Sequence, residues 1–131
     1  MTALPDWPDG TVTVLSTGGG APHAIPLSTA LRSGPATIHF ALGLRRESLA
    51  RLREDPRCAL TVLAAGLAVT ALGAATVVDE NDRVAFVRLD VEEVQDHGQP
   101  TFALDDGVRW HWTDDDAAAD DAEVRATLKT L

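Results

Sequence analysis

The tetrapeptide Arg109-Trp110-His111-Trp112 offers more binding chemistry than any other short stretch of the chain. Its two indole rings can stack on a planar ligand, and the guanidinium group beside them can bind an anion or lie against an aromatic face. The same two tryptophans can instead anchor the acidic end of the chain as part of a short strand. The sequence leaves both interpretations open.

His39 and Cys58 are the other reactive side chains within apolar segments. The imidazole of His39 can donate a proton to a ligand or be held as a hydrogen-bonded wall residue. Cys58 alternates with Leu60 and Val62, which predicts that its thiol packs inertly on an apolar face. Because the chain has one cysteine, no cluster with zinc spacing, no phosphate loop and no Ser/His/Asp arrangement, we assign no metal site and no catalytic residue.

The charge of the chain is strongly uneven. The formal net charge is -9, but residues 1–78 carry six arginines against five acidic side chains, and residues 79–131 carry five basic against fifteen acidic ones. An acidic surface repels a phosphate backbone, so nucleic acid is not an expected partner. The arginine-rich stretch Arg45–Arg57 is the one cationic exception.

The length of 131 residues fits one hydrophobic core, so we expect a single domain over residues 1–131, with an acidic low-complexity stretch at 113–121. The first ten residues lack a basic and an apolar region, and the longest apolar run is too short to span a membrane. Together with the lone cysteine, these features predict a cytoplasmic protein with no membrane partner.

Alternating apolar and β-branched residues predict a mainly β protein. Six strands are expected at Thr11–Thr17, His23–Leu31, Thr37–Leu42, Cys58–Leu63, Leu67–Val78 and Val84–Val94, with a possible seventh at Val108–Trp112. Pro26 cannot donate to a ladder, so it marks an edge or a bulge in the second strand. The alanines of Leu67–Val78 allow a helix as the alternative, but Val69, Val77 and Gly73 suit a strand that bends at a barrel corner.

Two helices complete the expected architecture. Leu49 and Leu52 stand three residues apart in a charged stretch that starts at Arg45 and stops before Pro56, which predicts a short amphipathic helix. A second helix is expected over Ala122–Leu131. This order of elements predicts a six-stranded antiparallel β-barrel, closed on itself, with a short helix and a C-terminal helix.

The segment from Gly20 to Val62 resembles the pyridoxamine 5'-phosphate oxidase-like split β-barrels. The resemblance rests on GAPHAIPLSTAL, then TIHFAL, then a helix RRESLARLRE that ends in Asp-Pro-Arg before another strand. Proteins of that family are mostly dimeric and bind FMN, or in some branches deazaflavin or haem. The resemblance therefore implies a split barrel, a homodimer and a flavin.

The resemblance also implies a place for the flavin ring along the second and third expected strands. The residues implied there are Pro26, Leu27, Ser28 and Thr29, with Phe40, Ala41 and Leu42 beside them. Such a site pairs the polar edge of the ring with hydrogen-bond partners and buries its apolar end. Without the resemblance, these would be ordinary strand residues on a half-exposed face.

The phosphate end departs from the family pattern. Aligned back from Asp55, Arg46 stands at the usual serine and Ser48 at the usual lysine, as if cation and hydroxyl had exchanged places, and Arg51 stands at a common Asn or Gln. Arg46, Ser48 and Arg51 can still hold a phosphate at the start of the helix, whereas Glu47 would oppose it. The alternative is a solvated helix face with surface arginines.

These observations predict an FMN-binding oxidoreductase of the pyridoxamine 5'-phosphate oxidase-like type, acting on a small-molecule ligand that the sequence does not identify. In such an enzyme the cofactor carries the electrons and no dedicated catalytic acid is needed. The alternatives are a deazaflavin protein, a haem protein with His39 as axial ligand, and a non-catalytic barrel that has lost its cofactor and binds a partner.

Overall fold

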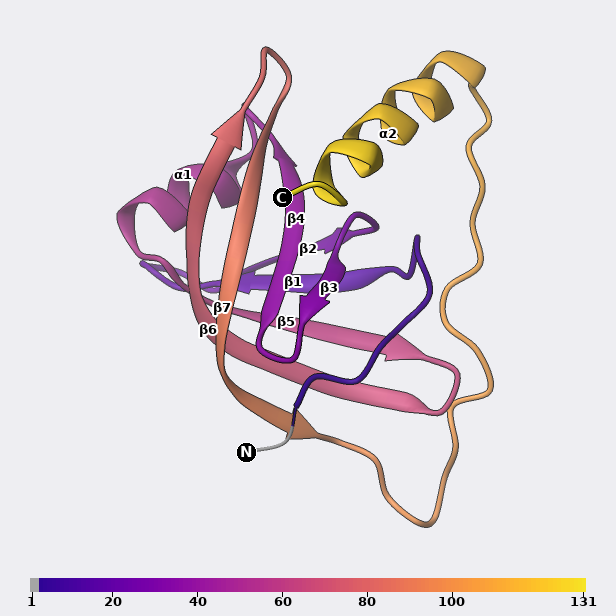
Figure 1. Ribbon diagram of the computed structural model, residues 1–131. Helices are drawn as coiled ribbons and strands as arrows, with labels where there is room; N and C mark the ends of the chain where they lie inside the picture. The colour runs from indigo at the N-terminus through magenta and orange to yellow at the C-terminus, as the bar shows by residue number, and fades with distance from the viewer. Residues whose placement is uncertain (1–2) are drawn as a thin grey trace.

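Seven antiparallel strands and two helices make up the computed structural model, which describes residues 3–131 (Figure 1). In chain order they are β1 (Thr13–Thr17), β2 (His23–Leu27), β3 (Leu31–Gly34), β4 (Thr37–Gly43), α1 (Glu47–Glu54), β5 (Arg57–Ala64), β6 (Leu67–Glu80), β7 (Val84–Asp96) and α2 (Asp115–Leu128). The mainly β class is thus confirmed, with one strand more than predicted.

The additional strand arises where the sequence predicts one interrupted strand over His23–Leu31. The chain leaves its first partner after Leu27 and pairs again from Leu31, so that β2 lies on β1 and β3 lies on β4. Pro26 lies within β2, which is an edge strand, where a proline is tolerated. The edge position predicted for Pro26 is confirmed.

The strand order is β2-β1-β5-β6-β7-β4-β3, and every neighbouring pair is antiparallel. In the described part of the chain, the two edge strands β2 and β3 do not pair, so the barrel is split rather than closed. The long strands β6 and β7 bend at two irregularities, Leu72/Gly73 and Val77/Asp79, which lets one sheet curl around its own core. The helical alternative for Leu67–Val78 is excluded.

The core lies on the concave side of this curled sheet. Its fully buried side chains include Leu15, Ile38, Phe40, Leu60 and Leu89. α1 adds Leu49 and Leu52, as the spacing predicts. A smaller cluster, made of Leu31, Ala41, Phe86 and Leu128, forms on the other face of β4 and seats the end of α2. Because both of its faces are covered, β4 has almost no exposed side.

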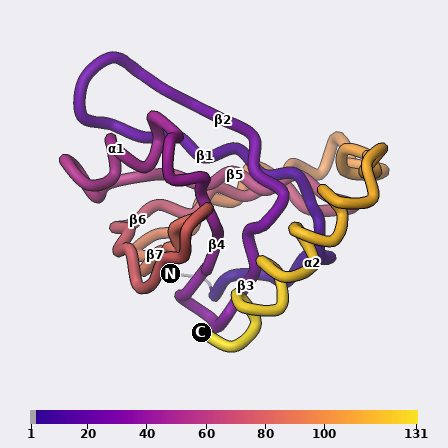
Figure 2. The backbone as a smooth tube through the Cα atoms, turned by 90° about the horizontal axis from the view of Figure 1, so that it is seen from above, coloured from indigo at the N-terminus to yellow at the C-terminus, as the bar shows by residue number. Residues whose placement is uncertain are grey.

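The C-terminal region differs from the prediction in two ways. α2 begins at Asp115 rather than Ala122, because the Asp114 carboxylate accepts hydrogen bonds from the N–H groups of Asp116 and Ala117 and so caps the helix within the acidic stretch. Residues 108–112 form no strand. They belong to the extended connection from β7 to α2, and the two helices lie at opposite sides of the molecule (Figure 1 and Figure 2). Neither helix in the described part of the chain is both long and apolar enough to span a membrane.

Candidate functional site

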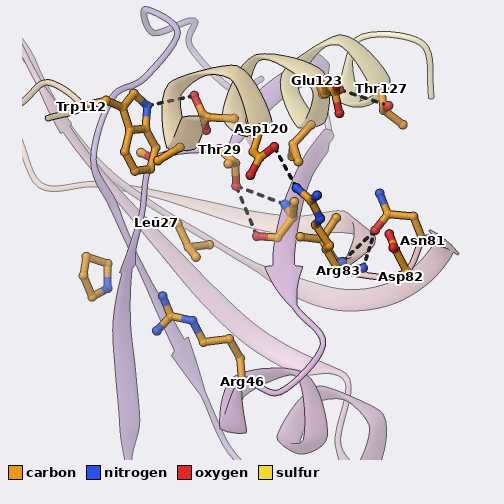
Figure 3. Close-up of a pocket in the computed structure, with 17 residues that line it drawn as sticks. Leu27, Thr29, Arg46, Asn81, Asp82, Arg83, Trp112, Asp120, Glu123 and Thr127 are labelled. Carbon is orange, nitrogen blue, oxygen red and sulfur yellow. Dashed lines mark hydrogen bonds and ion pairs between the residues drawn. The ribbon is translucent and has the colours of Figure 1, made fainter. Parts of the chain in front are cut away.

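A cavity of about 600 Å³ lies between the end of β2, the face of β4, the β6–β7 turn and α2 (Figure 3). Its wall combines apolar, hydroxyl and charged side chains from segments that are far apart in the sequence. The lining residues are Pro26, Leu27, Ser28, Thr29, Ala41, Arg46, Asn81, Asp82, Arg83, Val84, Trp112, Ala117, Asp120, Asp121, Glu123, Val124 and Thr127. This size and mixture suit a small organic ligand.

Five of the seven residues that the resemblance implies for a flavin ring line this cavity together. They are Pro26, Leu27, Ser28, Thr29 and Ala41. The Thr29 hydroxyl accepts a hydrogen bond from the Ala41 amide at 3.1 Å and donates to the Ala41 carbonyl at 3.3 Å, which fixes the loop after β2 against β4. These two elements are therefore held in contact by hydrogen bonds at the cavity wall.

The other two residues implied for the ring, Phe40 and Leu42, lie in the main core instead. Along β4 successive side chains point to opposite faces of the sheet. Because the Ala41 side chain faces the cavity, the side chains of Phe40 and Leu42 point into the core. Phe40 is 0% exposed and Leu42 is 1% exposed. Of these two residues, only backbone atoms are in a position to face a ligand at the Ala41 side.

The three residues expected to hold a phosphate are not brought together as a clamp. Arg46 lines the cavity, but Ser48 is only 1% exposed and its hydroxyl is 3.1 Å from Nε2 of His23. The Arg51 guanidinium donates to Glu47 Oε2 at 2.8 Å and to the Ala21 carbonyl at 2.6 Å. Arg51 thus ties α1 to the loop before β2, while Arg46 faces the cavity.

Ser48, His23 and Glu47 form a relay that the sequence does not reveal. His23 Nδ1 lies 3.2 Å from Glu47 Oε2, while its other ring nitrogen contacts the Ser48 hydroxyl. Donation from Arg51, with smaller contributions from His23, lowers the pKa of the Glu47 carboxyl. Although the order resembles a Ser-His-acid triad, the burial of Ser48 keeps a substrate carbonyl away from its hydroxyl. These contacts fix the start of β2 on α1.

The β6–β7 turn supplies cavity residues that the sequence analysis did not single out. Asn81, Asp82 and Arg83 lie in this turn, and Asn81 Oδ1 accepts from the backbone N–H groups of Arg83 and Val84. The Arg83 guanidinium reaches Asp120 on α2, with 2.8 Å between Nη1 and Oδ1, and this partner raises the pKa of the arginine. Figure 3 shows this pair bridging the cavity wall.

α2 contributes an acidic wall to the cavity. Asp120, Asp121 and Glu123 all line it. Asp121 accepts from Arg125 Nε at 2.7 Å and from the Trp112 indole at 3.3 Å. Arg125 also reaches the Ser28 hydroxyl at 3.4 Å, so α2 is linked directly to the loop after β2.

The Arg-Trp-His-Trp segment combines an anchoring contact with a place at the cavity wall. The Trp110 indole donates to the Gly10 carbonyl at 2.8 Å and so anchors the connection to the N-terminal segment. Trp112 lines the cavity beside α2. The two rings meet edge to face at 5.3 Å, which couples the anchoring ring to the cavity ring.

His39 and Cys58 lie away from this cavity. His39 Nδ1 is 2.6 Å from the Ser33 hydroxyl, and burial, with help from Arg88, lowers the pKa of the imidazole. Cys58 is buried in the main core, where desolvation raises the thiol pKa to about 12. The inert packing predicted for Cys58 is confirmed.

Comparison with known proteins shows what this fold resembles. No protein-family model matches the chain, and no curated protein matches it significantly. Solved structures do match, and among them is a candidate pyridoxamine 5'-phosphate oxidase from Lactobacillus delbrueckii, with 18% identity, a TM-score of 0.59, and 72% of this chain and 99% of that chain covered.

Two further matches are reductases. The flavin reductase component of a bacterial two-component tryptophan halogenase has 15% identity and a TM-score of 0.60 over 69% of this chain and 81% of that chain. The NADH:FAD oxidoreductase of Streptomyces globisporus has 15% identity and a TM-score of 0.59 over 66% of this chain and 75% of that chain. The chain therefore has the fold of the pyridoxamine 5'-phosphate oxidase-like split barrels, as the resemblance of Gly20–Val62 predicts.

Proposed function

We propose that this chain is a flavin-binding oxidoreductase of the pyridoxamine 5'-phosphate oxidase-like type, that FMN is its cofactor, and that it works as a cytoplasmic homodimer. The observation that carries the proposal is the meeting of Pro26–Thr29, Ala41 and Arg46 in one cavity of a split barrel. Solved structures with this fold include proteins described as a flavin reductase and an NADH:FAD oxidoreductase. The flavin would supply the redox chemistry.

The residues present suit the parts of FMN. Leu27 and Ala41 would offer apolar surface to the ring, and the hydroxyl groups of Ser28 and Thr29, which line the same wall, would serve its polar edge. Arg46 is a cation for the phosphate, next to the first turn of α1, where the helix dipole favours an anion. In the proposed complex these residues bind and orient the cofactor.

The test pairs Arg46→Gln with Arg45→Gln, because the two arginines are adjacent and exposed but only Arg46 lines the cavity. Loss of a charged hydrogen bond to phosphate is worth about 1.5 to 3 kcal/mol, so Arg46→Gln should weaken FMN about tenfold or more. Flavin fluorescence during titration measures the affinity.

Riboflavin is the control ligand, because it has the same ring as FMN but no phosphate, so its affinity reports on ring binding alone. The two variants should bind riboflavin as the unmodified protein does, and Arg45→Gln should also keep its FMN affinity. Equal FMN affinity in both variants would contradict the assignment of Arg46. Reduction of the FMN-loaded protein by NADH or NADPH, followed by absorbance, then tests the oxidoreductase activity.

A non-catalytic barrel is the second candidate function, and the acidic wall of the cavity favours it. Asp82, Asp120, Asp121 and Glu123 face two lining arginines, which disfavours an anionic cofactor. A protein that purifies without colour and binds neither FMN, riboflavin nor a deazaflavin at high micromolar concentration would support this candidate. Haem has less support, because His39, the expected axial ligand, lies away from the cavity and contacts Ser33.

A further inference from the structure

The ion pair between Arg83 and Asp120 joins two walls of the cavity that come from different parts of the chain. Arg83 belongs to the β6–β7 turn and Asp120 to α2, and both line the cavity. The side chains are 62% and 54% exposed, so water competes with the contact and the pair adds little to stability. The guanidinium of such an exposed pair readily exchanges its carboxylate partner for an anion that binds it more strongly.

The seat of α2 is also weak along most of its length. Leu128, in its last turn, is the one residue of α2 that is buried. Lys129, just beyond the helix, adds an exposed ion pair with Asp9 at 2.9 Å. N-terminal to Leu128, the helix is held over the cavity by an ion pair and hydrogen bonds. They are made by Asp120, Asp121 and Arg125.

We infer that Asp120 is an internal competitor for the cavity's anionic ligand: its carboxylate occupies the anion-binding position of Arg83, and the phosphate of the ligand displaces it. This inference rests on the proposed function for the identity of that ligand. It makes Arg83 a second phosphate-binding residue, besides Arg46, and Asp120 an autoinhibitory contact.

The chemistry of the two anions supports an exchange. A carboxylate and a phosphate both accept hydrogen bonds from a guanidinium fork, but the phosphate carries more charge and more acceptor oxygens. Once Arg83 turns to the ligand, Asp120 loses its partner and shares the cavity wall with Asp82 of the β6–β7 turn. Repulsion between these two carboxylates then favours an outward shift of α2, which opens the site to a substrate.

The experiment compares Asp120→Asn with Asp116→Asn, each alone, and repeats Asp120→Asn in an Arg83→Gln background. Asp116 is an exposed carboxylate of the same helix that does not line the cavity, so its variant controls for net charge. FMN and riboflavin are titrated by fluorescence, and pyrophosphate by calorimetry. We expect Asp120→Asn to tighten FMN and pyrophosphate at least fivefold, and Asp116→Asn to change them less than twofold. Riboflavin affinity should change less than twofold in both.

The Arg83→Gln background separates displacement from a general charge effect. If Asp120 acts by occupying Arg83, the gain from Asp120→Asn falls below twofold when Arg83 is absent. A gain that persists there would overturn the inference, since it would mean that Asp120 only repels anions. No gain for pyrophosphate in Asp120→Asn would overturn it as well.

Failure of the proposed function gives a different pattern. If neither FMN nor riboflavin binds to any variant, the flavin proposal fails, and the pyrophosphate series still decides whether Asp120 blocks an anion site. If both flavins bind but FMN and pyrophosphate ignore Asp120→Asn, the flavin proposal stands and the autoinhibitory contact is refuted.

Discussion

Burial of the His39 imidazole makes the stability of the folded protein depend on pH. The imidazole lies on β4, contacts the Ser33 hydroxyl and faces Arg88 and Asp90 of β7. Burial and, to a lesser degree, Arg88 lower the pKa from its ordinary 6.5, while Asp90 opposes the shift. The unfolded chain therefore protonates His39 at a higher pH than the folded protein does. The stability that comes from keeping His39 neutral is fully present above pH 6.5. It declines as the pH falls below 6.5 toward the lower pKa of the folded protein.

The change that tests this coupling is His39→Asn, with His111→Asn as the control at an exposed histidine. We expect the free energy of unfolding of the unmodified protein to fall between pH 7 and pH 5, and the fall to be smaller in His39→Asn. Urea unfolding followed by circular dichroism across this range measures both. Parallel pH profiles for His39→Asn and the unmodified protein would refute the coupling.

The candidate site residues fall into those that local sequence can identify and those that it cannot. Pro26–Thr29 and Ala41 are implied by the family resemblance of one stretch of chain, and the cavity brings them together. Arg83 lies between the strands expected at Leu67–Val78 and Val84–Val94, where no site was expected, and Asp120 lies in the acidic stretch at 113–121. Their meeting depends on the path from β7 to α2, which no local pattern encodes.

The register of β6 against β7 shifts between Leu72 and Gly73, where the two strands bend. A Cβ atom at this position would lie 2.0 Å from the Asp90 carbonyl oxygen and 2.9 Å from its carbon, both backbone atoms of the paired strand. Gly73→Ala therefore forces the two strands apart, and we expect a loss of about 3 kcal/mol in the free energy of unfolding. Chemical unfolding monitored by circular dichroism gives the value.

Gly34→Ala is the matched control for this change. Gly34 also lies in a strand, but an added Cβ meets only Thr37 side-chain atoms at 3.9 Å, an ordinary contact. Its effect should stay within about 1 kcal/mol. If Gly73→Ala proved as mild as this control, β6 and β7 would have to be less closely paired at Gly73 than the structure indicates.

The elements themselves were largely predictable, and their ends were not. Alternating patterns identify β4, β5, β6 and β7 because each buries a regular face. The start of α2 was wrong by seven residues, since the prediction treated acidic composition as low complexity. The Asp114 cap and the acidic first turn stabilise that part of the helix.

At the scale of the whole molecule, the sheet and α2 should differ in local stability. The central strands β5, β6 and β7 share the main core, whereas α2 contributes only the buried Leu128 and the partly buried Val124 to the smaller cluster. We expect the backbone amides of α2 to exchange hydrogen faster than those of the three strands, by at least tenfold. Hydrogen exchange followed by mass spectrometry resolves the two regions.

α1 provides the internal comparison in the same experiment, because this shorter helix buries Ser48, Leu49 and Leu52. Its amides should exchange more slowly than those of α2 despite its length of eight residues. Equal protection of α2 and β6 would mean that α2 is an integral part of the core, and would weaken the case that a ligand can shift it.

The sequence by itself determined the mainly β class and the short helix with its buried leucines, and it placed Pro26 at an edge or a bulge. These follow from periodicity and backbone chemistry, which act over a few residues. The loop that reaches the cavity was implied by the family resemblance instead. Only the tertiary structure decided that β3 forms a separate strand on β4, that Ser48 is buried on His23, and that α2 folds back so that Asp120 pairs with Arg83. Those outcomes depend on contacts between segments far apart in the chain. Packing and charge pairing determine such contacts only once the whole chain has folded.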